Sequence, residues 1–203
     1  MDEENVLKLV ILGEGRVGKT SMLSQYFNKK FDSSEKSTVN PSFYEKKVNS
    51  KGKTVNFKFW DTAGQEQFNA ISTIYYQNSV GAILVYDITI PETFEKVETW
   101  MNTLQEVVGK NITCLVVGNK YDLFDKNKSF NYTDKIKNFC DKYNCKHINT
   151  SAKTGYNINE AFKLILDSVL NKINQGGEVS GRKGKKLKIE TSENKGNEKK
   201  GCC

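Results

Sequence analysis

Long apolar runs are missing from this 203-residue chain. No stretch approaches the roughly 18–20 consecutive apolar residues that a helix needs to cross a bilayer. The first residues also lack the apolar segment of a secretory signal. We therefore expect neither a membrane-spanning helix nor a signal peptide.

Cysteine is scarce, with five residues whose positions form no disulfide framework. Cys114 lies within an apolar run, so we expect it in the core. Cys140 and Cys145 have no second pair and no histidine partners at the spacing of a zinc site, which indicates a structural role. The lack of a disulfide framework is typical of a reducing compartment. The other two cysteines, Cys202 and Cys203, are the last residues of the chain.

Most of the chain has only a small excess of positive charge. The net charge is +7, but residues 173–203 hold eight Lys or Arg and four Glu, so +4 lies there and +3 in the rest. The body therefore gives no reason to expect nucleic-acid binding. The last residues are poor in large apolar side chains and cannot offset the entropy of ordering. We expect one domain over residues 1–173 and a disordered basic tail over 174–203.

The strongest local pattern is the run from Gly13 to Thr20, which matches the phosphate-binding loop G-x-x-x-x-G-K-[ST]. Glycines let consecutive backbone N–H groups point into one concave space, and a helix that starts there adds its positive dipole end. In this pattern Lys19 reaches the β- and γ-phosphates, and the Thr20 hydroxyl ligates Mg²⁺. A glycine-rich loop without these roles is the alternative.

Apolar runs and helical spacing alternate along the chain. Strands are predicted at 6–12, 43–49, 54–60, 81–87, 112–118 and 146–149, and helices at 21–28, 91–108, 133–143 and 158–173, with a partly helical stretch at 70–78 and loops at 31–42 and 124–131. Strands that alternate with helices predict an α/β fold, with a mixed, mostly parallel six-stranded sheet and helices on both faces. The second and third strands form an antiparallel hairpin at the edge. Loops that contain Lys19, Asp61, Asp122 and Ala152 follow strands and should converge on one crevice.

The segment Asn119-Lys120-Tyr121-Asp122 discriminates between nucleotides. A phosphate loop alone is compatible with an ATPase, a kinase or a GTPase. A carboxylate in the base pocket can accept two hydrogen bonds from guanine N1–H and N2–H₂. Adenine lacks this donor pair and would leave the carboxylate desolvated and unpaired, at a cost of about 1–3 kcal/mol or more. An ordinary Asn-Lys turn after a strand is the alternative.

Four segments, Gly13–Thr20, Asp61–Gln65, Asn119–Asp122 and Ser151–Lys153, resemble in this order the motifs of the small GTPases of the Ras superfamily. Residues 60–66, 75–76 and 81–89 are similar to the Rab branch, and residues 13–15 and 38–43 to its endosomal members. The resemblance covers residues 6–173. It implies a P-loop small GTPase fold and a Mg²⁺-dependent switch that binds GTP and GDP, hydrolyses GTP and directs vesicle traffic.

The resemblance also implies roles for single residues. It places at the nucleotide Gly15, Arg16, Val17, Gly18, Lys19, Thr20, Ser21, Phe31, Thr38, Gly64, Asn119, Lys120, Asp122, Ser151, Ala152 and Lys153. Mg²⁺ would be bound by Thr20 and Thr38 and, through water, by Asp61. Gln65 would orient the attacking water, and Lys19 would hold the transferring phosphoryl group. A core aromatic remains the alternative for Phe31, and a helix-entry turn the alternative for Ser151.

No arginine in the chain is an evident internal finger, and the side chain of Arg16 is expected to face solvent. Hydrolysis should therefore be slow without an activating protein, which typically contributes about 10³–10⁵ in rate. Two rival functions stay open: a nucleotide-binding scaffold without useful hydrolysis and a metabolic P-loop kinase. Asn40, Pro41 and Gln67 depart from the family pattern and leave the identity of effectors and exchange factors open.

The family implies a monomer whose partners are an exchange factor, an activating protein, effectors, and prenylation and membrane-extraction chaperones. Phe43, Trp60 and Tyr75 match its aromatic effector surface, with packing inside the domain as the alternative. Cys202-Cys203 resembles the double geranylgeranyl signal and is not a C-a-a-X box. Two chains would anchor the protein to the cytoplasmic face of an endomembrane, endosomal by the resemblance, in exchange with the cytosol. An unmodified flexible end is the alternative.

Overall fold

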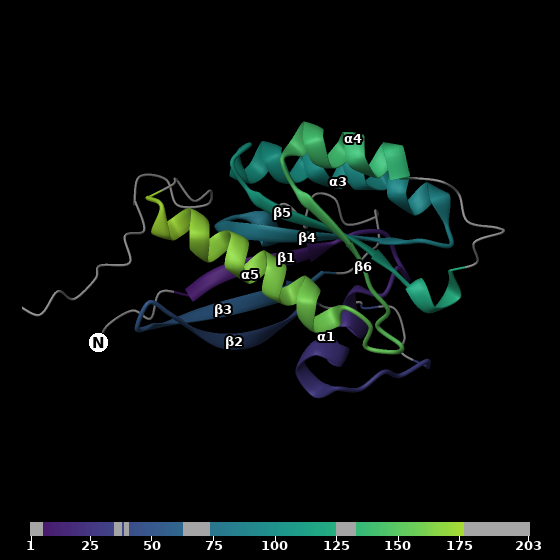
Figure 1. Cartoon of the computed structure of the whole chain (residues 1–203), viewed down its shortest axis with the longest axis horizontal. Helices are drawn as coiled ribbons and strands as arrows, with labels where there is room; N and C mark the ends of the chain where they lie inside the picture. Colours follow the sequence, from purple (N-terminus) through teal and green to yellow (C-terminus); the bar gives the residue numbers. More distant parts are fainter. Residues whose placement is uncertain (1–5, 35–37, 39–40, 63–73, 125–132, 177–203) are drawn as a thin grey trace, which may run out of the picture.

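The computed structural model describes residues 6–34, 38, 41–62, 74–124 and 133–176 (Figure 1). Several predictions fall outside these ranges: the roles of Gly64 and Gln65, the departures at Asn40 and Gln67, the tail beyond residue 176 and the terminal cysteines.

Six strands form one sheet, in the order β2-β3-β1-β4-β5-β6. They are β1 (Val6–Leu12), β2 (Ser42–Ser50), β3 (Lys53–Asp61), β4 (Ser79–Asp87), β5 (Thr113–Asn119) and β6 (Lys146–Asn149). β2 and β3 pair antiparallel, with Phe43 opposite Trp60. The other neighbours pair in parallel. The mixed, mostly parallel sheet with an antiparallel hairpin at its edge is therefore confirmed.

Four helices lie wholly within the described ranges. They are α1 (Lys19–Asn28), α3 (Pro91–Val108), α4 (Thr133–Tyr143) and α5 (Ile158–Asn174), with a short 3-10 turn η2 (Tyr121–Leu123) after β5. α3 and α4 have the predicted bounds. α1 begins two residues before the predicted start, because the left-handed Gly18 already places its carbonyl at the first helical bond, to Met22 N (2.9 Å). Residues 74–76 are helical, within the stretch predicted to be partly so.

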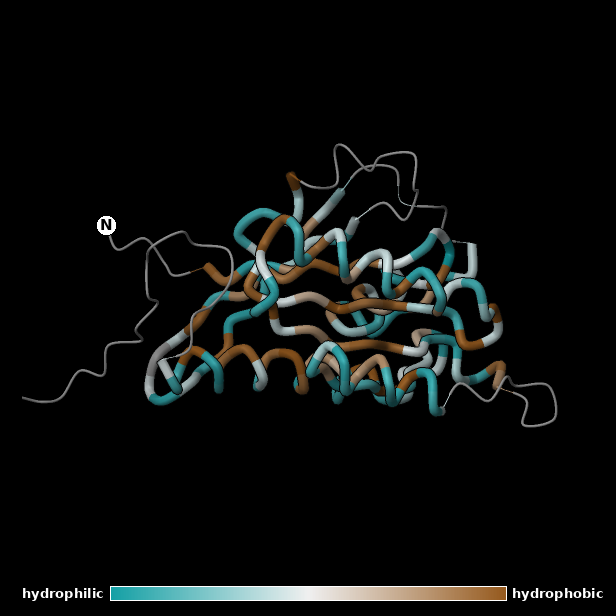
Figure 2. Tube along the Cα trace, turned by 90° about the horizontal axis from the view of Figure 1, so that it is seen from above, coloured by the Kyte–Doolittle hydropathy of each residue, from teal (hydrophilic) through white to brown (hydrophobic). Residues whose placement is uncertain are grey.

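The helices cover both faces of the sheet, because successive side chains of a strand point to opposite faces. In β1, Leu9 and Ile11 join the core cluster beneath α1 and α5, whereas Val10 and Leu12 join the cluster beneath α3 and α4. Figure 1 shows α3 and α4 together on one side of the strands. In Figure 2 the hydrophobic stretches run through the central strands, and the helices alternate between hydrophobic and hydrophilic turns.

The described cysteines behave as predicted. Cys114 is 7% exposed in the core, and Cys140 and Cys145 are half-buried free thiols. Burial raises the pKa of Cys114 to about 12, as expected for an inert core thiol. Within the described ranges, no helix is long and apolar enough to span a membrane.

Candidate nucleotide-binding site

A cleft of about 650 Å³ lies where the carboxyl ends of the strands meet. Most of the predicted nucleotide contacts line it: Gly15, Arg16, Gly18, Lys19, Thr20, Ser21, Phe31, Thr38, Asn119, Lys120, Asp122, Ala152 and Lys153. Val17 and Ser151 are buried outside the lining. The loops after β1, β5 and β6 therefore converge on one crevice, as expected for an open parallel sheet.

Two glycines of the phosphate loop are required by its geometry. Gly13 has φ +143°, and a Cβ there would lie 2.1 Å from the carbonyl oxygen of Val85. Gly18 has φ +95°, and a Cβ there would lie 2.4 Å from Asn119 Nδ2. Both positions combine a left-handed backbone with a close approach, so only glycine fits without displacing a neighbour. The loop therefore packs directly against β4 and the end of β5.

Lys19 begins α1 and is only 5% exposed. Its ammonium donates to the carbonyl oxygens of Gly13 and Glu14, each at 2.8 Å. Burial lowers its pKa to about 8, although the carboxylates of Asp61 and Glu14 act in the opposite direction. The ammonium thus lies inside the curl of the loop, where an anion would gain a direct charge partner.

Two hydroxyls and one carboxylate are available near the phosphate loop. The Thr20 and Thr38 hydroxyl oxygens lie 2.5 Å apart. Asp61 ends β3, is fully buried and is close enough to influence the pKa of Lys19. Hydroxyl and carboxylate oxygens are the ligands that Mg²⁺ prefers. The described residues hold no cluster of three or more His, Cys, Asp or Glu side chains suited to a metal ion.

Asn119 joins three loops around the cleft. It is 1% exposed, and its Nδ2 donates to the Val17 carbonyl at 2.9 Å. Its Oδ1 accepts from the Ala152 N–H at 3.1 Å and from the Thr150 hydroxyl at 3.2 Å. The residue predicted to contact the base thus also ties the phosphate loop to the loop after β6, a role that the sequence pattern does not indicate.

Asp122 lines the cleft from η2, and Ser151 orients it. The Ser151 hydroxyl donates to Asp122 Oδ1 at 2.6 Å, and Ser151 Oγ accepts from the Thr154 N–H at 3.1 Å. Ser151 therefore takes part in the turn before α5 and, from outside the lining, contacts Asp122, while its role at a nucleotide stays a prediction.

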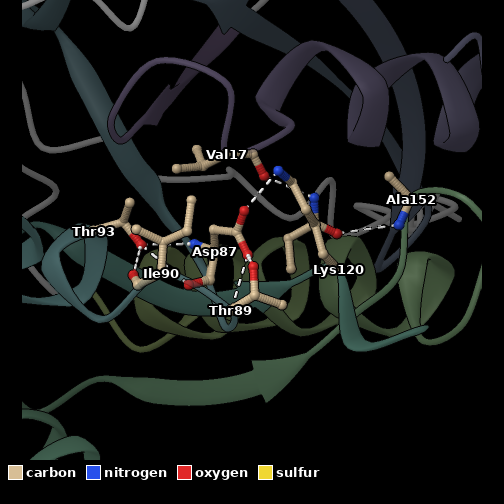
Figure 3. Close-up of polar contacts among 8 residues, drawn as sticks. Val17, Asp87, Thr89, Ile90, Thr93, Lys120 and Ala152 are labelled. Atoms are coloured by element: carbon tan, nitrogen blue, oxygen red, sulfur yellow. Dashed lines mark hydrogen bonds and ion pairs between the residues drawn. The ribbon is translucent and has the colours of Figure 1, made fainter. Parts of the chain in front are cut away.

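Lys120 makes a contact that the sequence analysis missed. Its ammonium lies 2.6 Å from Asp87 Oδ2, and Asp87 is only 2% exposed at the end of β4. Figure 3 shows Lys120 and Asp87 with Thr89, Ile90 and Thr93, which hold the turn into α3. The position of Asp87 at the carboxyl end of a central strand was the available signal.

Aromatic residues occupy two places near the cleft. Phe31 lines the cleft with 39% of its surface exposed, so the interpretation as a core aromatic is wrong. Phe43, Trp60 and Tyr75 form a row with ring centroids 5.7 and 5.8 Å apart. Phe43 is 49% exposed, whereas Trp60 and Tyr75 pack partly against the core. Four lining residues were not predicted: Asp32, Ser33, Ser34 and Leu123.

Comparison with known proteins gives a consistent result. The family model described as Ras family matches residues 8–171. The chain is 44% identical to the human Ras-related protein Rab-21 over 155 residues, which are 76% of this chain and 68% of that protein. It is 36% identical to the Ras-related protein YPTC6 of Chlamydomonas reinhardtii over 216 residues, which cover this chain fully and 96% of the relative. It is 35% identical to Rab-21 of Dictyostelium discoideum over 211 residues, with 100% and 98% covered.

Proposed function

The chain belongs to the Ras family, as a Rab-type small GTPase that regulates membrane traffic, and we propose how its cleft binds and hydrolyses GTP. The observation that carries the proposal is the meeting of the phosphate loop, Asn119, Asp122 and Ala152 around one cleft of nucleotide size. The phosphates would lie in the curl of residues 13–20 at the start of α1, with Lys19 neutralising the β- and γ-phosphates.

Mg²⁺, when bound, would neutralise charge that develops on the phosphate oxygens. We assign Thr20 and Thr38 as its direct ligands, because their hydroxyl oxygens lie 2.5 Å apart, and Asp61 as a ligand through water, because its carboxylate acts on the adjacent Lys19. Thr38 lies in the loop before β2, so a phosphate-bound cation would draw this loop against α1. Hydrolysis would release it, which is the general logic of a nucleotide switch.

Guanine would be selected by Asp122, whose carboxylate Ser151 holds in place. The stem of Lys120 would cover the base, and the Ala152 N–H would face guanine O6. Asp122→Asn should weaken GDP binding at least tenfold and shift preference toward xanthine nucleotides, because the amide presents a donor where guanine needs an acceptor. Competition binding against fluorescent GDP measures this shift. Asp134→Asn, an exposed change on α4, is the matched control.

If GDP affinity of Asp122→Asn equals that of the control, the assignment of the base pocket is wrong. Unchanged GDP affinity together with strong ATP competition would instead favour the rival P-loop kinase. The two results separate base selection from phosphate binding.

Gln65 would orient the attacking water, and hydrolysis should be slow because the described part of the chain offers no evident arginine finger: Arg16, its one arginine, belongs to the phosphate loop and is exposed. Single-turnover GTP hydrolysis, measured with and without an activating extract, should be strongly accelerated in the natural chain. Gln65→Leu should abolish that acceleration while leaving GTP affinity unchanged. Equal rates for the two proteins in the presence of extract would support the rival scaffold without useful hydrolysis.

Effectors would dock on the row of Phe43, Trp60 and Tyr75, because Phe43 keeps 49% of its surface exposed beside two half-buried rings. Phe43→Ala in the Gln65→Leu background should lose most captured partners and leave GDP dissociation unchanged. Ile90→Ala, another exposed apolar residue, is the control. Equal capture by both variants would contradict this surface.

The terminal Cys202 and Cys203 would carry two geranylgeranyl chains, and the basic tail would add attraction to an anionic membrane. This supports reversible attachment to an endomembrane, endosomal by the sequence resemblance, with membrane-extraction chaperones as partners. Mass spectrometry of the protein from its own cell should find both thiols alkylated. Free thiols in the membrane-bound fraction would contradict the proposal.

A further inference from the structure

Asp87 is a buried carboxylate that lies behind the cleft rather than in its lining. Its two oxygens have separate partners. Oδ1 accepts from the Thr89 N–H at 2.9 Å and from the Thr89 hydroxyl at 2.6 Å. Oδ2 lies 2.6 Å from the ammonium of Lys120. One oxygen therefore serves the turn into α3, and the other serves a residue of the cleft.

The turn into α3 has further bonds that do not involve Oδ2. The Ile90 N–H donates to the Asp87 carbonyl at 3.0 Å, and the Thr93 hydroxyl donates to the Ile90 carbonyl at 2.6 Å. The Asp87 N–H donates to Thr93 Oγ1 at 3.0 Å. The turn thus uses Oδ1 and the backbone of Asp87. The ion pair between Oδ2 and Lys120 is not needed to form the start of α3.

Lys120 needs an anchor if its stem is to form a fixed wall. Its backbone is left-handed, with φ +66°, and its side chain is 32% exposed beside the cleft. A lysine stem has four rotatable bonds, so a free ammonium would sample many positions in water. The ion pair ties its end to the rigid end of β4, which pairs with β5 at Asp87 and Asn119. The Ile88 N–H adds a bond to the Asn119 carbonyl at 3.1 Å.

We propose that Asp87 is a positioning residue for nucleotide binding: its Oδ2 fixes the end of Lys120, so that the lysine stem lies ordered against the base. The inference rests on the proposed nucleotide site. The order is established before the ligand arrives, so a bound nucleotide does not have to immobilise the stem. Loss of the ion pair should therefore appear mainly as faster nucleotide release.

The test uses the full chain loaded with fluorescent GDP and Mg²⁺, and it measures the dissociation rate after excess GDP is added. Asp87→Asn keeps one oxygen that can accept from Thr89, and it replaces the charged Oδ2 that pairs with Lys120 by an amide NH₂ group. We expect dissociation about tenfold faster, which corresponds to about 1.4 kcal/mol. Thr89→Val removes a bond to Oδ1 but not the ion pair, so its rate should stay within twofold of the natural chain.

Lys120→Met tests the ion pair apart from the apolar part of the side chain, since methionine keeps much of the apolar length of lysine without the ammonium. Its dissociation should also accelerate about tenfold, and the Asp87→Asn/Lys120→Met protein should be no faster than the faster single variant. This non-additivity is a signature that a merely structural role for Asp87 would not produce. Lys120→Met also decides the question if Asp87→Asn does not fold, because a rate within twofold of the natural chain would overturn the anchor.

Two results overturn the inference: an Asp87→Asn rate within twofold of the natural chain, or single-variant effects that multiply in the double variant. Failure of the natural chain to bind fluorescent GDP would instead refute the nucleotide site itself. The two failures are therefore distinguishable in one series of measurements.

Discussion

Asn119→Ala should remove the hydrogen bonds that join the phosphate loop to the loop after β6. Asn119 is 1% exposed; its Nδ2 donates to one protein partner and its Oδ1 accepts from two. Truncation would leave the Val17 carbonyl and the Ala152 N–H, which belong to residues 1% and 3% exposed, without these partners. Each unpaired buried group costs about 1–3 kcal/mol. The Thr150 hydroxyl adds little, because its bond is 3.2 Å long and the hydroxyl can rotate to another acceptor.

The total for Asn119→Ala is therefore about 2–6 kcal/mol. Part of it opposes folding and part opposes nucleotide binding, because the amide joins the phosphate loop to the loop after β6. If about half of the middle of this range, or about 2 kcal/mol, falls on binding, GDP release becomes about 30-fold faster. Dissociation of fluorescent GDP in the presence of Mg²⁺ measures this directly.

Thr150→Val is the matched control, since it removes one bond to Asn119 and keeps the backbone bonds of Thr150 to Gly118 and Tyr121. Its GDP release should stay within about threefold of the natural rate, a change below about 0.7 kcal/mol. Release from Asn119→Ala within threefold of the natural rate would refute the reasoning. An equal acceleration in both variants would also refute it.

Two further predictions concern the fold. Gly13→Ala should lower the free energy of unfolding by about 2–5 kcal/mol, because its Cβ would lie 2.1 Å from the Val85 carbonyl oxygen. Gly52→Ala should lower it by only about 1–2 kcal/mol, because Gly52 has φ +76° but open space around it. Urea titrations of the two variants measure the difference. Burial lowers the pKa of His147 to about 4. Between pH 6.5 and 4 the imidazole is therefore protonated in the unfolded chain and neutral in the folded chain. The free energy of unfolding should fall by up to about 3 kcal/mol from pH 6.5 to 4, and His147→Gln should remove this part of its pH dependence.

The layered sheet could be predicted because its signals are local. Residues 6–12, 81–87 and 112–118 are continuous apolar runs, and α3 and α5 carry apolar residues at helical spacing. β1 and β6 have the predicted bounds, whereas the other four strands differ from the predicted ones by one or two residues at their ends. These ends depend on pairing partners, which a single strand's sequence does not show. The start of α1 at Lys19 depends on the left-handed Gly18 in the same way.

Most of the cleft lining was also predictable, because many of its residues follow strands and match known motifs; Asp32, Ser33, Ser34 and Leu123 belong to no motif and were missed. The connections between lining residues were not. Asp87 and Lys120 lie 33 positions apart and meet only because β4 and β5 pair in register at Asp87 and Asn119. Likewise, Asn119 reaches Val17 across 102 positions. A sequence pattern identifies the groups that touch a ligand more readily than the groups that hold them in place.

Competition between GTP and ATP for the purified chain tests the central claim most directly. The protein is loaded with fluorescent GDP in Mg²⁺, and unlabelled nucleotides displace it. A base pocket built on Asp122 predicts that GTP competes at least about 10³-fold better than ATP, since adenine lacks the donor pair and would cover the carboxylate without bonding to it. Equal competition by ATP and GTP would contradict the account.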